Sequence, residues 1–193
     1  VTEARGLRMM DGTDGLLGFS GMYVGFGYNG ATVLSSWSSL LENSQTGGSV
    51  YLGHSLYGMP FLSDEQWMKH LGLELQGEAH VFNTKKASNR YEGKLYTAPC
   101  SAGIFVSVLP LSLPFELLLR GDAGMVASKL DVQVNDHAKK VISIDPFFTG
   151  GASLRFTFAD YFFAETGGAW TYYRFSDTPM SGVGYFFRVG LRL

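Results

Sequence analysis

The stretch "HLGLELQGEAHVF", His70–Phe82, alternates between two kinds of residue. Its odd positions hold leucine, glycine, alanine and valine, while its even positions from Glu74 to His80 are acidic or polar. Because side chains along a β-strand point alternately to opposite faces, this period of two predicts a strand with one apolar and one charged face. The fold depends on which of the two faces meets the interior of the protein.

The rest of the chain shows the same alternation and little helical periodicity. The alternating segments are separated by polar or proline-containing turns, as in a sheet of successive hairpins. Eight segments fit this description: 18–29, 49–58, 70–82, 101–113, 115–128, 142–158, 162–175 and 183–193. We therefore predict an all-β fold, an eight-stranded antiparallel up-and-down transmembrane β-barrel.

Composition limits the class of protein. The chain has 193 residues and a formal net charge of -2, with 17% charged residues, 15% aromatic residues and 25 glycines. One barrel accounts for this length, and the lack of a basic surplus predicts no nucleic-acid partner. Few charges with many rings and glycines suit strands that lie in a bilayer between aromatic belts. The single cysteine, Cys100, leaves no internal disulfide, and we expect no cofactor and no metal site.

The uncharged segment 95–115 is long enough to cross a bilayer as a helix. It contains Pro99, Pro110 and Pro114, each of which would cost a helix about 3 kcal/mol. We therefore predict an extended strand followed by a proline-marked turn.

The connections between the predicted strands differ in length. Those near Pro114 and at 159–161 are short, whereas 30–48, 83–90 and 130–140 are longer and polar. Alternating short and long connections are typical of outer-membrane barrels, which have short periplasmic turns and longer extracellular loops. The charged segment 130–140 can be either a loop or a strand tip that extends beyond the membrane.

The residues on the charged faces indicate which face of each strand points into the barrel. They sit among glycine, alanine, serine and threonine, and the predicted strand cores contain almost no lysine. Small residues with matched acids and bases suit the narrow interior of an eight-stranded barrel, where charges pair across a short gap. We predict an inward charge network of Glu74, Glu78, His80, Glu116, Arg120, Asp122, Arg155, Glu165, Arg188 and Arg192.

The opposite faces are rich in phenylalanine, leucine and valine, with rings toward the strand ends. An arginine on these faces near the bilayer midplane would cost about 2–4 kcal/mol, which fixes the register. We predict lipid contact for Leu71, Leu73, Leu75, Leu117, Leu119, Leu154, Phe156, Phe158, Phe187, Val189 and Leu191.

A soluble barrel with an apolar interior is the alternative to this inverted polarity. His54 is the residue that leaves this alternative open, because it shares a face with Val50 and Leu52. A bulge in that strand, or a different register, would also explain its position.

Two stretches carry a family resemblance: the last strand, "VGYFFRVGLRL" (183–193), and the hairpin "ASLRFTFADYFFAETGGAWTYYRF" (152–175). They resemble the small outer-membrane β-barrel superfamily of OmpX, OmpW and the transmembrane domain of OmpA. The last strand is similar to the C-terminal signal read by the barrel-assembly machinery, although it ends in Leu193 where the family usually has phenylalanine. The resemblance implies the outer membrane of a diderm bacterium and says less about function, because this fold supports many roles.

The domain organisation follows from the same pattern. We expect residues 1–14 to form an N-terminal periplasmic segment and residues 15–193 to form the barrel. The segment lacks the apolar core of a signal peptide, so we expect a processed N-terminus.

Eight strands enclose a lumen that side chains just fill. We therefore expect a protein that is not an enzyme and has a structural or surface-interaction role through its loops 30–48, 83–90, 130–140 and 176–182. Its expected partners are the lipid bilayer of the outer membrane, the barrel-assembly machinery and an unidentified host or surface partner.

Two further functions remain open. A narrow channel, or an OmpW-type conduit for a small hydrophobic molecule, would need a gap such as Gly21, Gly25, Gly27 and Gly167 could leave. A lipid-modifying enzyme would need a serine in contact with a histidine, whereas the adjacent His54 and Ser55 point to opposite faces of a regular strand.

Overall fold

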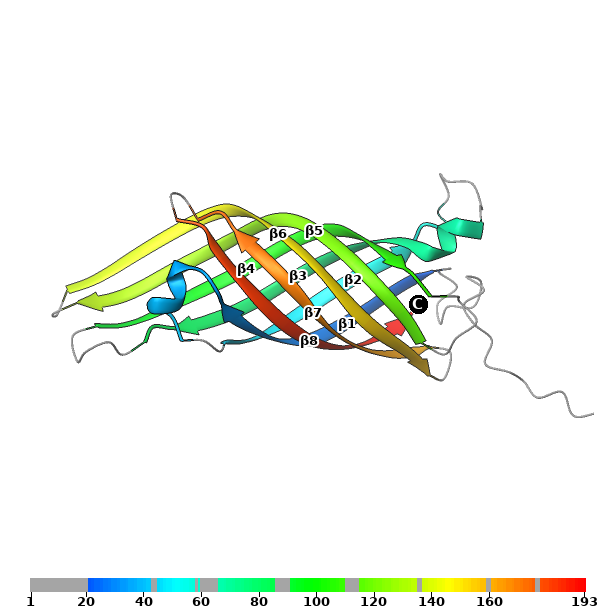
Figure 1. The fold of residues 1–193 in the computed structure, drawn as a ribbon, viewed down its shortest axis with the longest axis horizontal. Helices are drawn as coiled ribbons and strands as arrows, with labels where there is room; N and C mark the ends of the chain where they lie inside the picture. The colour runs from blue at the N-terminus through cyan, green and yellow to red at the C-terminus, as the bar shows by residue number, and fades with distance from the viewer. Residues whose placement is uncertain are drawn as a thin grey trace, which may run out of the picture.

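The computed structural model describes residues 21–42, 45–57, 59, 66–85, 91–109, 115–134, 137–158, 161–175 and 178–193. In these residues eight strands form a closed barrel, each paired with the next and the last with the first (Figure 1). They are β1 (Met22–Val33), β2 (Gln45–Ser55), β3 (Leu71–Asn83), β4 (Tyr91–Ser107), β5 (Phe115–Val134), β6 (His137–Phe158), β7 (Phe162–Tyr173) and β8 (Met180–Arg192). Two short 3-10 helices, η1 (Ser36–Ser39) and η2 (Gln66–His70), lie between strands.

Every neighbouring pair of strands is antiparallel. The predicted eight-stranded up-and-down barrel is therefore confirmed. The segment 95–115 is extended where it is described, since β4 runs through Pro99, and the turn predicted at Pro110 and Pro114 lies outside the described residues. No helix among the described residues is long and apolar enough to cross a membrane. The N-terminal segment predicted at 1–14 also lies outside them.

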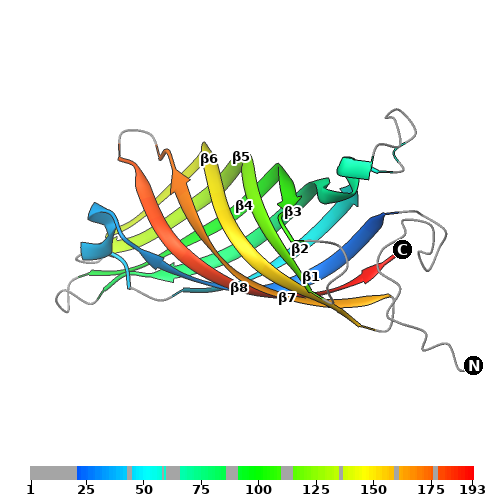
Figure 2. The ribbon, with the colours of Figure 1, turned by 45° about the vertical axis from the view of Figure 1, so that its right-hand side comes forward.

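The two longest strands extend the barrel at one end. β5 and β6 contain 20 and 22 residues, and their ladder continues from Phe115↔Phe156 to Val134↔His137. Figure 1 shows this hairpin projecting at the left, at the end of the barrel that we call the projecting end. Figure 2 shows the start of β1 and the end of β8 at the other end of the barrel. The opposite end, where β1 begins and β8 ends, is the terminal end. The charged segment 130–140 is thus a strand tip and not a loop.

The predicted alternation of short and long connections is only partly correct. The strands are joined at 34–44, 84–90, 135–136 and 174–179 on the projecting end, and at 56–70, 108–114 and 159–161 on the terminal end. The longest connection therefore lies on the terminal end. The predicted loop 30–48 is also too long, because the β1–β2 ladder continues to the pair Ala31↔Gln45.

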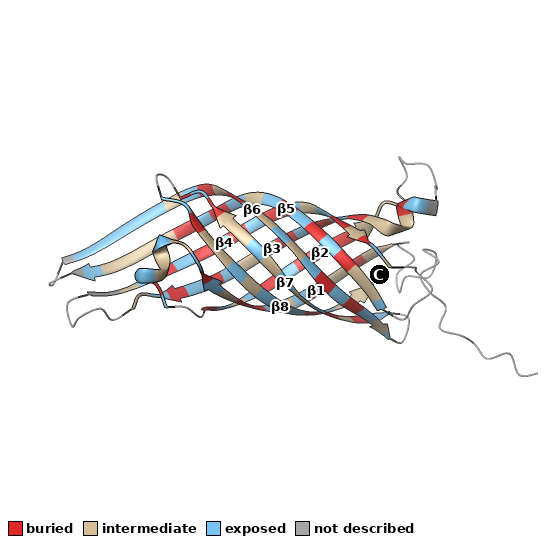
Figure 3. Ribbon diagram, viewed as in Figure 1, coloured by how far each residue is buried: buried red, intermediate tan, exposed pale blue. Residues whose placement is uncertain are grey.

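The polarity of the barrel is inverted relative to a soluble protein. On β3, Leu73 and Leu75 are 44% and 57% exposed, whereas Glu74 and His80 are 2% and 5% exposed. Figure 3 shows buried and exposed residues alternating in this way along the strands. A membrane barrel requires an apolar outer wall, and a soluble barrel would show the opposite arrangement. The outward set contains every residue predicted to contact lipid: Leu71, Leu73, Leu75, Leu117, Leu119, Leu154, Phe156, Phe158, Phe187, Val189 and Leu191.

Aromatic side chains mark two levels on the outer wall. Exposed rings toward the projecting end are those of Tyr28, Phe148, Trp170 and Tyr185. Exposed rings toward the terminal end are those of Phe115, Phe158, Tyr161 and Phe162. Rings at two levels are the expected anchors at the two membrane–water interfaces.

His54 needs neither a bulge nor a changed register. The pairs Met22↔His54 and His54↔Leu73 belong to ladders that run along β2 without interruption. His54 points outward but is the second-last residue of β2, and its Nδ1 contacts the backbone carbonyl oxygen of Ser55. It therefore lies near the rim of the barrel, where an outward-facing imidazole has only a small free-energy cost.

Candidate functional site in the barrel lumen

An apolar layer closes the lumen toward the terminal end. It consists of the buried residues Tyr23, Tyr51, Phe105, Leu118 and Phe163. The Tyr23 ring lies at its centre, with ring centroids 5.5 Å from Phe163, 6.0 Å from Phe105 and 6.2 Å from Tyr51. Tilted and edge-to-face rings at these distances attract one another beyond the burial of their area. We call this layer the floor.

Glu165 binds two arginines directly above the floor. Its Oε2 accepts hydrogen bonds from Arg155 Nε at 2.9 Å and from Arg120 Nη2 at 3.0 Å. Its Oε1 lies 2.8 Å from Arg120 Nη1. The three side chains are at most 4% exposed, so these charges are paired almost without water. Since they come from β5, β6 and β7, they join three strands.

Glu74 is the second centre of the network. Its Oε1 lies 2.8 Å from Arg188 Nη1 and 3.5 Å from Arg120 Nη1, and its Oε2 accepts a hydrogen bond from the Tyr23 hydroxyl at 2.8 Å. Arg120 therefore bridges the two glutamates. The contact between Arg188 and Glu74 joins residues that are 114 positions apart in the sequence.

The network continues along β3 toward the projecting end. Arg188 Nη2 donates to Gln76 Oε1 at 2.5 Å, and Gln76 Nε2 donates to Glu78 Oε1. His80 Nε2 lies 2.5 Å from Glu78 Oε2. An unbroken series of contacts thus runs from Arg155 to His80.

Aromatic rings complete the surroundings of the arginines. The guanidinium carbon of Arg155 lies 4.3 Å from the Tyr23 ring centroid and 4.5 Å from that of Phe163. That of Arg188 lies 4.4 Å from the Phe186 ring and 4.7 Å from the Tyr51 ring. Buried guanidinium groups are stable only when paired, and ring faces add a favourable cation–π contact. This arrangement fills the middle of the lumen, and we call it the plug.

All ten residues predicted for the charge network point into the lumen, but they do not form one cluster. Seven of them make up the plug and its continuation: Glu74, Glu78, His80, Arg120, Arg155, Glu165 and Arg188. Glu116 and Arg192 form a separate pair at the terminal end, with Oε1 and Nη2 3.5 Å apart. Asp122 is buried without a hydrogen bond to any described side chain.

Two members of the plug were not singled out from the sequence. Gln76 shares the alternation of Glu74 and Glu78, which was a sufficient signal for an inward polar residue. Tyr23 faces inward in the alternation of β1, but no spacing rule indicates that its hydroxyl reaches a carboxylate on β3.

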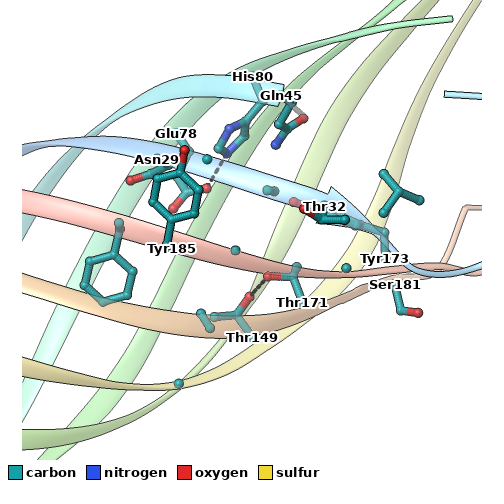
Figure 4. A pocket seen from close by; sticks show the side chains of 18 of the residues that line it. Asn29, Thr32, Gln45, Glu78, His80, Thr149, Thr171, Tyr173, Ser181 and Tyr185 are labelled. Carbon is teal, nitrogen blue, oxygen red and sulfur yellow. Dashed lines mark hydrogen bonds and ion pairs between the residues drawn. The ribbon is translucent and has the colours of Figure 1, made fainter. Parts of the chain in front are cut away.

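A second apolar cluster, the roof, covers the lumen toward the projecting end. Its buried residues are Val33, Leu41, Phe82, Leu95, Val126, Phe147, Tyr173, Phe175 and Met180, and Trp37 of η1 packs against them. Between the plug and the roof lies a chamber with a cavity volume of about 70 Å³. Figure 4 shows Asn29, Gln45, Glu78 and His80 on one side of it, opposite the hydrogen-bonded pair Thr149 and Thr171.

The chamber is not the gap predicted from glycines. The Tyr51 ring occupies the space at Gly25, and the Phe186 ring and Ser153 occupy that at Gly167. Ser49 and Arg188 likewise fill the space at Gly27. Other small residues line the chamber: Ala31, Gly151, Ala169 and Gly184.

His54 and Ser55 do not form a catalytic pair. The Ser55 hydroxyl lies 3.4 Å from the backbone carbonyl oxygens of Met68 and Leu71, and His54 points to the other side of the strand. Nucleophilic catalysis by serine needs the imidazole within hydrogen-bond reach of the hydroxyl.

We expect no single-channel conductance from the reconstituted protein in a planar bilayer. The buried rings of the floor and the paired charges of the plug lie inside the barrel, and we infer that they leave no water-filled path. A wide porin inserted into the same bilayer serves as the positive control. Reproducible conductance steps from the purified chain would contradict a closed lumen.

Solved structures with the same architecture are outer-membrane proteins. Ail, the attachment invasion locus protein of Yersinia pestis, has a TM-score of 0.59 at 14% identity, over 90% of this chain and 99% of its own. Neisserial surface protein A has a TM-score of 0.58 at 16% identity, over 90% and 98%. A major outer membrane protein of Thermus thermophilus has a TM-score of 0.54 at 8% identity, over 86% and 99%. Ail has also been solved in complex with the heparin analogue sucrose octasulfate.

No protein-family model matches the chain, and no curated protein matches its sequence. The architecture is nevertheless specific: a closed eight-stranded barrel with an apolar outer wall and a charged interior. The chain therefore has the fold of the small outer-membrane β-barrel proteins.

Proposed function

We propose that this chain is an integral outer-membrane protein that binds a partner at the cell surface, and that it is neither a channel nor an enzyme. In this proposal the outward leucine and phenylalanine side chains meet lipid, and the plug holds the barrel rigid. The projecting part of β5 and β6 presents the binding surface. The C-terminal strand serves as the signal for the barrel-assembly machinery. The observation that carries the proposal is an unpaired edge on β6.

The unpaired edge results from the different lengths of β6 and β7. β6 pairs with β5 from His137 onward, but its first pair with β7 is Phe147↔Tyr173. One further hydrogen bond, from Arg174 N to Pro146 O at 3.0 Å, ends the contact on that side. Among the described residues, no strand covers the segment of β6 before Pro146.

The sequence fits the position at which β6 loses β7 as its neighbour. In an antiparallel ladder the N–H and C=O of one residue point to the same side. Because Pro146 O bonds to Arg174, the even-numbered residues before it turn their N–H and C=O toward the open side. Proline has no N–H, and it occurs within sheets mainly at such edges. Lys140, Ile142 and Ile144 therefore offer free backbone groups to an added strand.

The side chains along the edge support a docking role. Ile142 and Ile144 are 74% and 69% exposed. Phe148 is the exposed ring on β6 that lies toward the projecting end. Ile144 lies roughly 13 Å further along the strand in the same direction. Two isoleucines beyond the belt gain nothing from lipid, and an exposed apolar surface of this kind marks an interaction site. Addition of a strand to an open sheet edge is an established mode of peptide recognition.

The partner is best described as an extended segment of a protein. Lys139 and Lys140 are exposed at the edge, which disfavours pairing with a second copy of the same strand and favours an acidic segment. The heparin analogue bound by Ail shows that a protein of this fold can hold a polyanion. A sulfated ligand for the lysines is therefore the competing possibility that the experiment must separate.

The test uses the barrel in nanodiscs and a displayed library of ten-residue peptides. We expect enriched peptides to alternate apolar and polar residues and to carry acidic side chains. Replacing Ile142 and Ile144 together with proline removes two edge N–H groups, and we expect it to weaken peptide binding at least tenfold. The matched control replaces the same two residues with threonine, which keeps the N–H groups and the strand propensity.

Sucrose octasulfate is the second probe, with the double variant Lys139→Gln and Lys140→Gln. Equal peptide binding by the proline and threonine variants would contradict strand addition. If no peptide binds while sucrose octasulfate binds and depends on the two lysines, the surface takes polyanions and the proposed partner class is wrong.

A further inference from the structure

A groove lies on the inner face of the projecting hairpin. Its cavity volume is about 260 Å³, roughly twenty times the volume that a single water molecule needs. Its apolar lining consists of Trp37, Leu95, Leu130, Val141 and Phe175. Val141 is 44% exposed although its side chain faces inward, opposite Leu130 of β5. The groove is therefore an apolar surface that the described residues leave uncovered.

The groove and the open edge belong to the same segment of β6. Val141 and Ser143 line the groove from this strand. They alternate with Ile142 and Ile144, whose N–H and C=O groups face the open side. Because side chains of a strand alternate between two faces, a strand added to the edge would turn every second side chain toward the groove.

We propose that the groove holds one aromatic side chain of the strand that docks on β6. This inference rests on the proposed strand addition and names the side chain that makes it specific. Three features carry it: the position of the groove in the register of β6, the rings in its lining, and the charge beside it.

The register brings one residue of the added strand close to the groove. The even-numbered residues of β6 turn their backbone groups to the open side, so Val141 lies in a pair without hydrogen bonds. Side chains in such pairs lie closer together than those in hydrogen-bonded pairs. Ser143 also faces inward, but its hydroxyl bonds to that of Ser128 at 2.7 Å. Val141 is thus the uncovered apolar position, and the residue opposite it reaches the groove.

The lining favours a ring. Trp37 and Phe175 both line the groove, and their ring centroids are 5.9 Å apart with the planes tilted by 56°. The Trp37 indole is held by its Nε1, which donates a hydrogen bond to the backbone oxygen of Thr178 at 3.3 Å. Tilted rings attract one another beyond the area that they bury, and a third ring can join them. Tryptophan and tyrosine are also enriched among the residues that dominate interface affinity.

Lys139 gives the docked strand a preferred order of side chains. It is exposed, it shares the inward face with Val141, and no ion pair joins it to a described residue. Asp145, the other charged inward residue between 139 and 147, is 7% exposed and lies roughly 20 Å further along β6. An acidic residue of the docked strand would therefore lie opposite Lys139.

The direction of β7 sets the order of the two side chains. A strand that continues β7 is antiparallel to β6, so its residue opposite Lys139 follows the one opposite Val141 by two positions. We therefore expect an aromatic residue, any residue, and then an acidic residue. The aromatic residue breaks the alternation of apolar and polar residues at one position.

The experiment measures the binding of synthetic ten-residue peptides to the barrel in nanodiscs by fluorescence polarisation. The first peptide alternates threonine and valine, with tryptophan at its fifth and glutamate at its seventh position. The second has alanine in place of tryptophan, and the third has tryptophan and glutamate exchanged. We expect the first to bind at least tenfold more tightly than the second and at least about twofold more tightly than the third.

Two variants and a matched control test the assignment. Leu130→Trp fills the groove from β5 without changing the edge of β6, and we expect it to remove the advantage of tryptophan over alanine. Lys139→Gln should make the first and third peptides bind equally. Lys140→Gln, on the outward face, should preserve their difference. Gel mobility with and without boiling verifies that each variant is folded.

The outcomes separate this inference from strand addition itself. Equal binding of the tryptophan and alanine peptides, lost in the double variant Ile142→Pro and Ile144→Pro, would overturn the groove assignment and leave strand addition standing. A tryptophan advantage that persists in folded Leu130→Trp would do the same. If the tryptophan peptide still binds the double proline variant, or if no peptide binds the unaltered barrel, both proposals are wrong.

Discussion

Replacing Glu165 with glutamine is expected to lower the free energy of unfolding of the barrel by about 3–5 kcal/mol. Glu165 is the only carboxylate within 3.0 Å of Arg155 among the described residues, and it also pairs with Arg120. The amide keeps the size of the side chain but removes its charge. Two buried guanidinium groups then lose their main counterion, which is more costly than the pair was favourable.

Reversible unfolding in urea, followed by tryptophan fluorescence in lipid vesicles, measures this loss. The control is Glu116→Gln at the terminal end, where the contact to Arg192 is 3.5 Å and both side chains retain some exposure. We expect that variant to lose less than about 1 kcal/mol. If the two variants lost similar amounts of unfolding free energy, the distinction between the plug and the Glu116–Arg192 pair at the terminal end would be contradicted.

Replacing Leu154 with arginine is expected to destabilise the inserted barrel by about 2–4 kcal/mol. Leu154 is 45% exposed on the outer wall and pairs with Leu117 and Thr166, midway between the two levels of aromatic rings. An arginine there must place its charge in the hydrocarbon region or bend toward an interface.

The matched control is Ile142→Arg, which replaces a more exposed apolar residue on the same strand but beyond the aromatic rings. We expect little change in stability for this variant, because its arginine would be in water. If both arginine variants lower the free energy of unfolding in urea by the same amount, or if neither lowers it, the position assigned to the membrane is wrong.

The alternation in the sequence was enough to predict the barrel and the direction of its side chains. Glu74, Arg155 and Arg188 occupy strict period-two positions, and in a closed sheet such a position leaves only the lumen or the outside. The contrast between these charged residues and apolar neighbours such as Leu73 and Phe156 then indicates which face points into the lumen and which faces outward. The period-two alternation is a reliable signal because each strand is regular.

The pairing inside the lumen could not be predicted from the sequence. Arg188 meets Glu74, and Tyr23 meets the same carboxylate, only because of the stagger of all eight strands around the barrel. No spacing along the chain encodes that stagger. The same holds for the chamber, whose lining brings together small residues of four strands, such as Ala31 and Gly151.

The ends of the strands were the least predictable feature. The segment 130–140 contains four lysines or aspartates and three further polar residues, and composition alone suggests a loop as readily as a strand tip. It forms a ladder because its residues pair directly across a tight connection, as Asp131 does with Lys140. Conversely, η2 and the connection 56–70 show that a long connection can lie at the end expected to have short turns.

Collision of spin labels with two relaxation agents tests the inverted polarity most directly. Labels are attached in lipid vesicles to the variants Leu154→Cys, Phe156→Cys and Ser153→Cys, each made in a Cys100→Ser background. Because hydrocarbon surrounds the barrel, we predict that the labels at 154 and 156 collide with oxygen and not with a water-soluble nickel chelate. The label at 153, which faces the filled lumen, should be reached by neither. Frequent collisions of the first two labels with the nickel chelate, together with protection from oxygen, would contradict this account.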